Sequence, residues 1–357
     1  MSLYIISESY FQTSVWYRNI YDGLVSELKR KKITYRCIDD VVQASKDKNS
    51  IIFILGTNIA WITETVLKCN EINARPILLC GTQKNNIIPG TYSSVCADVE
   101  GSMKYIISNF KKQGAKKCAL YGVNRLSVFN MSQRDTFLNN GITETFEEDI
   151  YYNEGSLSNC YNMFLEKSDI YDAVISVNDF ATVNLIKNLD EKATCFLMAG
   201  YGGGVLVKDK YPDFFSISPG YNKFSKAAIS IYEILKSNKD INSVSITVKY
   251  DSYPDSNDTK EFENEISDTN AEKSDKSFYT DDETRNMVQI ENMLNKCDDM
   301  DFTILKMLTK DTSYEKISES LFCSVNTIKY RIKKMKEYCM CDSKKELITI
   351  MKNYLNS

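Results

Sequence analysis

Short apolar runs alternate with longer amphipathic stretches along the first 250 residues, and this alternation constrains the fold more than any other feature. The runs have the length of buried strands, and the stretches between them repeat apolar residues at the helical period. Strands that alternate with helices form βαβ units and parallel sheets. Roughly ten strands over a segment of this length favour two doubly wound lobes over one. The predicted fold class is therefore α/β, with a two-lobed parallel-sheet domain over residues 1–250.

The strand candidates are short runs separated by predicted helices. They are Leu3–Ile6, Thr34–Ile38, Ile51–Leu55, Pro76–Cys80, Ser93–Ala97, Cys118–Tyr121, 143–148, Ala173–Val177, Cys195–Ala199, Phe214–Ile217 and Val244–Lys249. In doubly wound sheets, ligands bind beyond the carboxyl ends of the strands. The loop residues that directly follow strands are therefore the candidates for a binding site.

The net charge of −4 hides a strong asymmetry between two later segments. Residues 251–285 contain twelve acidic and four basic residues, net −8, whereas residues 299–357 contain eleven basic and eight acidic residues, net +3. Residues 251–285 also lack apolar periodicity, which predicts a flexible, self-repelling linker. A short connecting helix is predicted over 286–298, leading into the last domain or pairing with its copy in a dimer.

Residues 299–357 predict a small unit of three or four helices with marked starts. Thr312-x-x-Glu315 and Ser343-x-x-Glu346 match the capping box, in which hydroxyl and carboxylate each accept from the other residue's backbone N–H. Ser324 is a favourable N-cap for the helix between them.

The helix from Val325 to about Tyr338 has two chemically different faces. Val325, Ile328, Ile332 and Met335 recur at helical spacing and predict a buried stripe. Five basic residues and one acidic residue lie in 325–338, and an α-helix with a basic face suits a DNA major groove. Basic amphipathic helices are more often solvated faces, but three capped helices at this spacing favour DNA binding. The predicted DNA contacts are Asn326, Thr327, Lys329, Tyr330, Lys333 and Lys334.

Residues 299–354 resemble the C-terminal helix-turn-helix domain of LuxR/GerE-type transcription regulators. The most specific part is the pattern S-x-x-T-[VI]-K, present here as Ser324 to Lys329. The resemblance implies base and groove contacts by Lys329, Tyr330 and Lys333. The chain departs from the family in three places: it lacks a glycine within 310–313, it has Tyr-Cys-Met-Cys after the recognition helix in place of Lys-Leu-Gly-Val, and it has Arg331 where histidine is frequent.

Residues 3–250 resemble the sensor domain of LacI/GalR regulators, which has a type 1 periplasmic-binding-protein-like fold. Four motifs in order carry the resemblance: Ser-Val-Trp-Tyr at 14–17, Ser-Val-Cys-Ala-Asp at 94–98 followed by Gly101, Gln-Arg-Asp-Thr-Phe at 133–137, and Ser-Val-Asn-Asp-Phe-Ala at 176–181. The resemblance implies that two aromatic residues stack on a ligand and that three polar residues hydrogen-bond it. These implied contacts are Trp16, Tyr17, Asp98, Arg134 and Asn178.

The glycine run at 200–204 departs from this second family. Sugar-binding relatives place an aspartate here, whereas this chain has Gly-Tyr-Gly-Gly-Gly, of which Tyr201 is taken as a further candidate ligand contact. A dinucleotide-type phosphate loop would need glycine at the position of Val205, so a flexible strand-to-helix crossing is favoured. Simple packing of Trp16 and Tyr17, and a surface ion pair of Arg134, are the alternatives to ligand contact.

Residue usage argues against a metal site and a secreted location. The chain has eleven cysteines without paired spacing and no histidine, so zinc binding is disfavoured and a reducing cytosol is favoured. No signal peptide and no apolar run long enough to span a membrane are evident. We therefore predict a cytoplasmic protein without cofactor or metal.

Together these patterns predict a transcription regulator, and not an enzyme, in which a sugar-like or other polar small molecule in the cleft modulates binding of double-stranded DNA. A homodimer would place two recognition helices on two half-sites. The alternatives are a solute-binding protein, a sensor whose cleft serves a protein partner, an enzyme on a doubly wound fold, and a phosphorylation-driven regulator. Without histidine, an enzyme would need a carboxylate, lysine or tyrosine as its general base.

Overall fold

The computed structural model describes residues 2–9, 14–47, 49–81, 88–142, 145–153, 155–211, 214–218, 220–250 and 282–356. Contacts divide the chain into two compact units. The first comprises Met1–Gly203 and Phe215–Phe278, and the second comprises Gly204–Phe214 and Tyr279–Ser357. The predicted acidic linker lies outside the described residues as far as residue 281.

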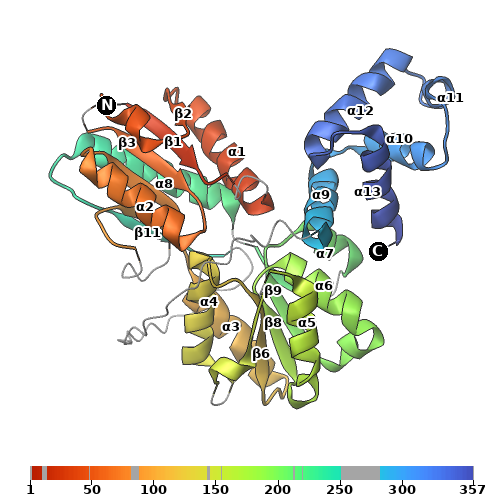
Figure 1. Ribbon diagram of the computed structural model, residues 1–357, viewed down its shortest axis with the longest axis horizontal. Helices are drawn as coiled ribbons and strands as arrows, with labels where there is room; N and C mark the ends of the chain where they lie inside the picture. The colour runs from red at the N-terminus through yellow and green to blue at the C-terminus, as the bar shows by residue number, and fades with distance from the viewer. Residues whose placement is uncertain are drawn as a thin grey trace. The chain divides into compact units, whose positions relative to one another are not determined.

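The first lobe of the first unit contains a six-stranded parallel sheet of order β11-β5-β4-β3-β1-β2 (Figure 1). The strands are β1 (Leu3–Ser7), β2 (Arg36–Ile38), β3 (Ile51–Leu55), β4 (Arg75–Gly81), β5 (Ser93–Ala97) and β11 (Ser245–Val248). Helices cover both faces of the sheet. One face carries α1 (Val15–Arg30) and α8 (Tyr221–Ser237), and the other carries α2 (Ile59–Glu71) and the 3-10 helix η2 (Val41–Ala44).

The second lobe contains a five-stranded parallel sheet of order β10-β9-β8-β6-β7. Its strands are β6 (Cys118–Val123), β7 (Ile150–Tyr152), β8 (Ala173–Ser176), β9 (Leu197–Tyr201) and β10 (Phe215–Ile217). Its helices are α3 (Val99–Lys112), α4 (Val128–Asn140), α5 (Leu157–Leu165) and α6 (Asp179–Leu189), with 3-10 helices η3 (Glu147–Asp149), η4 (Ser168–Ile170) and η5 (Asp190–Cys195). The five strands follow the same order as the first five of the other lobe, which confirms two doubly wound lobes.

Continuous apolar strands explain why the sheets are covered on both sides. All five residues of β3 are completely buried, as expected for a parallel strand with helices on both faces. A strand of alternating polar and apolar residues would instead leave one face to solvent. The two lobes also meet within the unit, where Val128 N–H donates to Thr57 O at 2.9 Å and Ile59 N–H donates to Leu126 O at 3.0 Å.

The strand predicted at 143–148 is wrong, because the strand of this region is β7, at Ile150–Tyr152. Residues Glu147–Asp149 form the 3-10 helix η3 instead. Phe146 N–H donates to the Asp149 carboxylate at 3.0 Å, and this turn ends any extended backbone before β7. Acidic residues compete in this way because their side chains bond nearby backbone groups.

The second unit is helical. It contains α9 (Asp282–Lys296), α10 (Asp299–Thr309), α11 (Tyr314–Ser320), α12 (Val325–Cys339) and α13 (Lys344–Asn356), together with α7 (Val205–Lys210). The connecting helix expected at 286–298 is α9, which begins four residues earlier and ends two residues earlier. The short helix α7 has no counterpart among the predicted elements. It lies in sequence between β9 and β10 of the second lobe, yet its contacts belong to the helical unit.

Candidate functional site

Helix α12 is positioned by its own cap and by an apolar stripe. Ser324 accepts a hydrogen bond from Thr327 N–H at 3.0 Å, as predicted for an N-cap. Ile328, Ile332 and Met335 are at most 5% exposed, which confirms three members of the predicted stripe. Val325 is only half-buried, because it begins the helix at the exposed end of that stripe. Packing therefore fixes which side of α12 faces outward.

The outward side of α12 carries the residues predicted to contact DNA. Asn326, Lys329, Tyr330 and Lys333 are exposed, and Thr327 and Lys334 are half-buried. The Tyr330 side chain is 61% exposed. Lys334 Nζ pairs with the Glu337 carboxylate at 2.7 Å, so one of these cations is partly neutralised by its own helix. The two fully outward lysines are the cations most available to a phosphate backbone.

The N-cap of helix α11, which precedes α12, lies one residue later than predicted. Its N-cap is Ser313, which accepts from Lys316 N–H at 3.4 Å, so the expected capping box from Thr312 to Glu315 is wrong. In the box expected from Ser343 to Glu346, Ser343 does accept from Glu346 N–H at 3.1 Å. The Glu346 carboxylate, however, accepts from Asp342 N–H at 3.0 Å, one residue before the cap. Adjacent hydroxyl and acidic residues are near-equivalent caps, so sequence does not choose among them.

Arg331 is used within the helical unit itself. Its guanidinium donates to both carboxylate oxygens of Asp298, at 3.0 and 2.9 Å, and to Asp301 at 2.8 Å. These two aspartates form the capping box that starts α10. Arg331 therefore joins the cap of α10 to the middle of α12, a role that its position beside the predicted DNA face did not indicate.

The aromatic pair at the start of α1 is packed inside the two-lobed unit. Trp16 meets Phe224 of α8 edge to face, with ring centroids 6.1 Å apart. Tyr17 is 8% exposed and donates its hydroxyl to Ser7 Oγ, at the carboxyl end of β1, at 2.9 Å. Burial is the largest cause that raises the pKa of Tyr17. Tyr17 thus lies beside the strand end where a ligand would bind, while Trp16 fills a helix–helix contact.

Two of the predicted polar contacts act as helix caps. Asp98 accepts from Gly101 N–H at 3.0 Å and starts α3. A Cβ on Gly101 would lie 2.4 Å from that carboxylate, which explains why glycine stands in the motif. Asn178 accepts from Ala181 N–H at 2.9 Å at the start of α6. Both residues follow strands, at the end of the sheet where ligands bind in doubly wound folds, and both side chains already bond the backbone.

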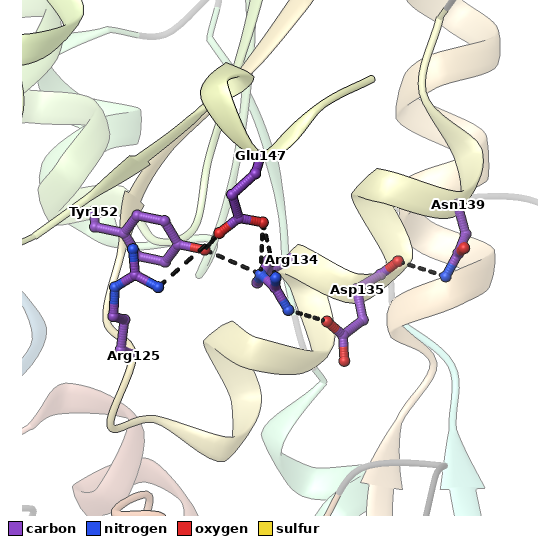
Figure 2. Close-up of polar contacts among 6 residues, drawn as sticks. All are labelled: Arg125, Arg134, Asp135, Asn139, Glu147 and Tyr152. Atoms are coloured by element: carbon purple, nitrogen blue, oxygen red, sulfur yellow. Dashed lines mark hydrogen bonds and ion pairs between the residues drawn. The ribbon is translucent and has the colours of Figure 1, made fainter. Parts of the chain in front are cut away.

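Arg134 lies in a cluster of charged and aromatic side chains (Figure 2). Its guanidinium donates to Glu147 at 2.7 and 3.2 Å, to the Tyr152 hydroxyl at 3.0 Å and to Asp135 at 2.8 Å. The Tyr152 hydroxyl donates to the other oxygen of Glu147. Arg125 lies over the Tyr152 ring, 3.3 Å from its centroid. The Arg134 side chain is 12% exposed, whereas its partners Glu147 and Asp135 are 48% and 41% exposed, so this is a surface ion pair with a largely buried arginine.

The pKa values of this cluster favour its charged form. Burial lowers the pKa of Arg134, but the bond to Glu147 and the negative charges nearby together raise it more, and the net pKa lies above the ordinary value. Burial raises the pKa of Glu147, while Arg134 and Tyr152 lower it more, and the net pKa lies below the ordinary value. Burial and the bond to Glu147 raise the pKa of Tyr152 to about 12. The pair Arg134–Glu147 is therefore ionised near neutral pH.

Tyr201 is buried within the two-lobed unit, at the end of β9. It is 3% exposed, and its hydroxyl lies 3.2 Å from Ser102 Oγ on α3. Burial raises its pKa. Tyr201 is the last residue of β9, at the carboxyl end of the sheet, where the glycine run begins. Its buried ring therefore supports this end of the sheet from within.

A polar network beside the glycine run is absent from the sequence-based expectations. Ser216 of β10 donates to the Asp179 carboxylate at 2.7 Å and accepts from Gly203 N–H at 2.8 Å. Gly202 and Gly203 have φ of 142° and 65°, values that favour glycine. A Cβ on Gly202 would lie 2.6 Å from the Asp179 carboxylate. The Asn-Asp order at 178–179 was the only signal for this network, and its partners come from a strand 37 residues away.

Metal ligands and membrane-spanning helices do not occur in the described part of the chain. Among residues with described positions, no group of three or more cysteine, aspartate or glutamate side chains could hold a metal ion. No helix in the same part of the chain is long and apolar enough to cross a membrane.

Comparisons with known proteins identify the fold of the two-lobed unit. No family model matches the chain, and no curated protein matches it by sequence. One similar solved structure is the transcriptional regulator CelR in complex with cellobiose, with a TM-score of 0.55 and 12% identity over 70% of this chain and 82% of that one. A second is a regulatory protein of the LacI family from Chloroflexus aggregans, with a TM-score of 0.57 and 11% identity over 70% of this chain and 96% of that one. A third is the transcription regulator CcpA of Lactococcus lactis, with a TM-score of 0.54 and 15% identity over 71% of this chain and 98% of that one. At these identities the likeness concerns the fold. The two parallel-sheet lobes have the periplasmic-binding-protein-like fold of LacI-family sensors.

Proposed function

We propose that this protein is a DNA-binding transcription regulator whose two-lobed sensor responds to a small polar molecule. The observation that carries the proposal is the outward face of α12, on which Asn326, Lys329, Tyr330 and Lys333 are exposed while its apolar stripe is packed. Together with Thr327 and Lys334, they are the proposed DNA contacts, in a domain of the LuxR/GerE helix-turn-helix type. The likeness of the sensor to regulators of the LacI family supports the same function.

The effector site that we propose lies between the carboxyl edges of the two sheets. Tyr17 and Ser7 are at one edge, and Arg125, the Arg134 cluster and Asn178 are at the other. An effector with hydroxyl or carboxylate groups would meet donors and acceptors at both edges, which suits a sugar or a sugar acid. Trp16, Asp98 and Tyr201 would hold this site through packing, capping and support of the sheet edge.

Regulation then follows from a difference in affinity. An effector shifts the protein between two states only by as much as it binds one of them more tightly. Closure of the lobes on the effector would change how the helical unit is presented to DNA. A homodimer would place two copies of α12 on half-sites about one helical turn apart, and the protein would act in the cytoplasm, where DNA is present.

The test combines DNA selection with a ligand screen on the full chain. Selection from random duplexes should enrich a near-palindromic sequence, and binding to it should weaken with salt with a slope of about −0.9 per phosphate contacted. A thermal-shift screen against sugars, sugar acids, nucleosides and amino acids should identify compounds that stabilise the sensor by mass action. No enriched sequence together with a flat salt response would contradict the proposal.

A further inference from the structure

Helix α7 is a segment of the sensor's sequence that packs as part of the helical unit. It follows Gly203 directly and is followed by β10, so both of its ends are continuous with the sensor lobe. Its buried residues are Leu206 and Val207. Its packing partner is α9, which itself packs against α12 and α13. The chain therefore passes from the sensor into the reader, the helical unit that carries α12, and back again within a dozen residues.

A carboxylate of α9 holds the start of α7. Glu291 accepts from Val205 N–H at 2.8 Å and from Leu206 N–H at 2.7 Å. The N-cap of α7, Gly204, has no side chain with which to bond these amides, so Glu291 supplies from another helix the cap that the local sequence lacks. Asn295 Nδ2 adds a third donor to Glu291 at 2.7 Å. Glu291 is only 3% exposed, and these three donors satisfy its charge.

The other end of α7 is held by α13. Lys210 donates to Tyr354 O at 2.9 Å and lies 4.5 Å from the centroid of the Tyr354 ring. The Tyr354 hydroxyl donates to Asp209 at 3.0 Å. Because both ends of this short helix are bonded to reader helices, α7 moves with the reader and not as a loop of the sensor.

The residue before the N-cap of α7 is tied to the sensor's polar edge. Gly203 N–H donates to Ser216, and Ser216 donates to Asp179, which follows the proposed effector contact Asn178. A rearrangement at that edge would therefore act on the backbone at the N-cap of α7 through two hydrogen bonds and one peptide link.

Helix α9 buries polar side chains among its apolar ones, and one of them is not fully hydrogen-bonded by the part of the chain that the structure describes. Its seven residues from Met287 to Met293 are all buried, yet three of them are polar: Gln289, Glu291 and Asn292. The Nδ2 atom of Asn292 is buried without a hydrogen-bond partner among the described residues. Buried polar groups that are not fully bonded weaken a packing arrangement relative to its alternatives.

We propose that α7 is the element through which the sensor acts on the reader, and that Glu291 is the positioning residue that transmits this action to α9 and α12. The inference rests on the proposed function for its meaning, because the transmitted signal is effector binding. It names the physical route of that signal: Asp179, Ser216 and Gly203 to α7, then Glu291 to α9.

A double-mutant cycle in the full chain tests this route without effector or DNA. Hydrogen exchange is measured in peptides covering α9 for the wild type, Ser216→Ala, Glu291→Leu and the double variant. Ser216→Ala should speed exchange in α9 severalfold, and Glu291→Leu should speed it on the order of tenfold, because α9 loses the two hydrogen bonds that join it to the start of α7. In the Glu291→Leu background, Ser216→Ala should add nothing, because the link is already broken.

The proposal is overturned if Ser216→Ala leaves α9 unchanged in the wild-type background, or if it speeds exchange by the same factor in both backgrounds. Glu319→Leu, at an exposed carboxylate of α11, is the matched control and should leave α9 unchanged. If Ser216→Ala fails to fold, Gly203→Ala strains the same turn, since its Cβ would lie 2.7 Å from that of Ser218. A negative result would leave the proposed DNA binding standing, because neither DNA nor effector enters this measurement.

Discussion

The outward face of α12 and the carboxyl edges of the sensor sheets use their polar residues differently. On α12, Tyr330 is 61% exposed, and Lys329 and Lys333 are exposed with it. At the sensor edges, the Arg134 side chain is 12% exposed and bonded to Glu147. One region presents its polar groups to solvent, unbonded to the other described helices, whereas the other holds a largely buried arginine in several bonds to protein side chains.

This difference implies two modes of binding. A phosphate backbone can pair with the lysines of α12 and release counterions without breaking an existing protein contact. An effector at the sensor edges must instead exchange partners with groups that are already bonded, and only the surplus over those bonds appears as affinity. Such an exchange would change the structure of the two-lobed unit only if the effector binds one of its states more tightly than the other.

Removal of the two outward lysines should produce the greatest change in DNA binding. The double variant Lys329→Ala with Lys333→Ala should lower the affinity for the selected duplex by roughly tenfold to a hundredfold. Its salt slope should shrink by about 1 for each phosphate that the variant no longer touches. Fluorescence anisotropy at several salt concentrations measures both quantities.

The matched control for this variant removes two lysines from α13. Lys345→Ala with Lys352→Ala makes the same change of net charge at exposed positions, and should alter affinity far less. Equal losses of affinity in the two double variants would mean that net charge, and not the face of α12, determines binding.

Arg134→Ala should change the stability and the effector response of the two-lobed unit and leave DNA binding by the helical unit nearly unchanged. It leaves Glu147, whose side chain is 48% exposed, and the Tyr152 hydroxyl without their main partner, so we expect a loss of roughly 1 kcal/mol in the free energy of unfolding. It should also abolish the response to any effector found by thermal shift, while DNA affinity without effector stays within a factor of about two. Urea denaturation and anisotropy measure the two effects separately.

The conservative variant Arg134→Lys separates a ligand contact from a structural role. Lysine keeps the charge but not the fork that reaches Glu147 and Asp135 together. Recovery of stability without recovery of the effector response would assign Arg134 to ligand contact. A joint loss of stability and of DNA binding in Arg134→Ala would instead make it a purely structural residue.

Arg331→Gln tests whether Arg331 serves the cap of α10 or the DNA face of α12. Loss of the bonds to Asp298 and Asp301 should speed hydrogen exchange at the start of α10 and cost about 1 kcal/mol of local stability, because the pair is partly exposed. The salt slope of DNA binding should not change. A slope smaller by about 1 would show that Arg331 leaves Asp298 to contact phosphate.

Periodicity predicted the parts of this molecule that packing fixes locally. The run Ile51–Leu55 and the stripe Ile328, Ile332 and Met335 could be read from sequence because burial depends on spacing along one element. Contacts between elements that are distant in the chain could not be predicted from the sequence. The pairing of Arg134 with Glu147 and the packing of α7 in the helical unit both depend on which distant segments meet in the folded chain. The periodicity of a single segment carries no information on such contacts.

The smallest effect that we expect is the pH dependence of the stability contributed by the ion pair between Arg331 and Asp298. The backbone N–H of Asp301 and the Arg331 guanidinium lower the pKa of Asp298 below its ordinary value. A depressed carboxylate contributes stability above its unfolded pKa of about 3.9, and this contribution is lost as pH falls through the folded pKa. The Asp298 side chain is 58% exposed, so the contribution should be under about 1 kcal/mol. Asp298→Asn should therefore be slightly less stable than the wild type at pH 7 and approach it as pH falls through the folded pKa of Asp298, as measured by urea denaturation followed by circular dichroism. A difference that stayed constant with pH would mean that the charge of Asp298 does not contribute to stability, because that charge is lost on protonation.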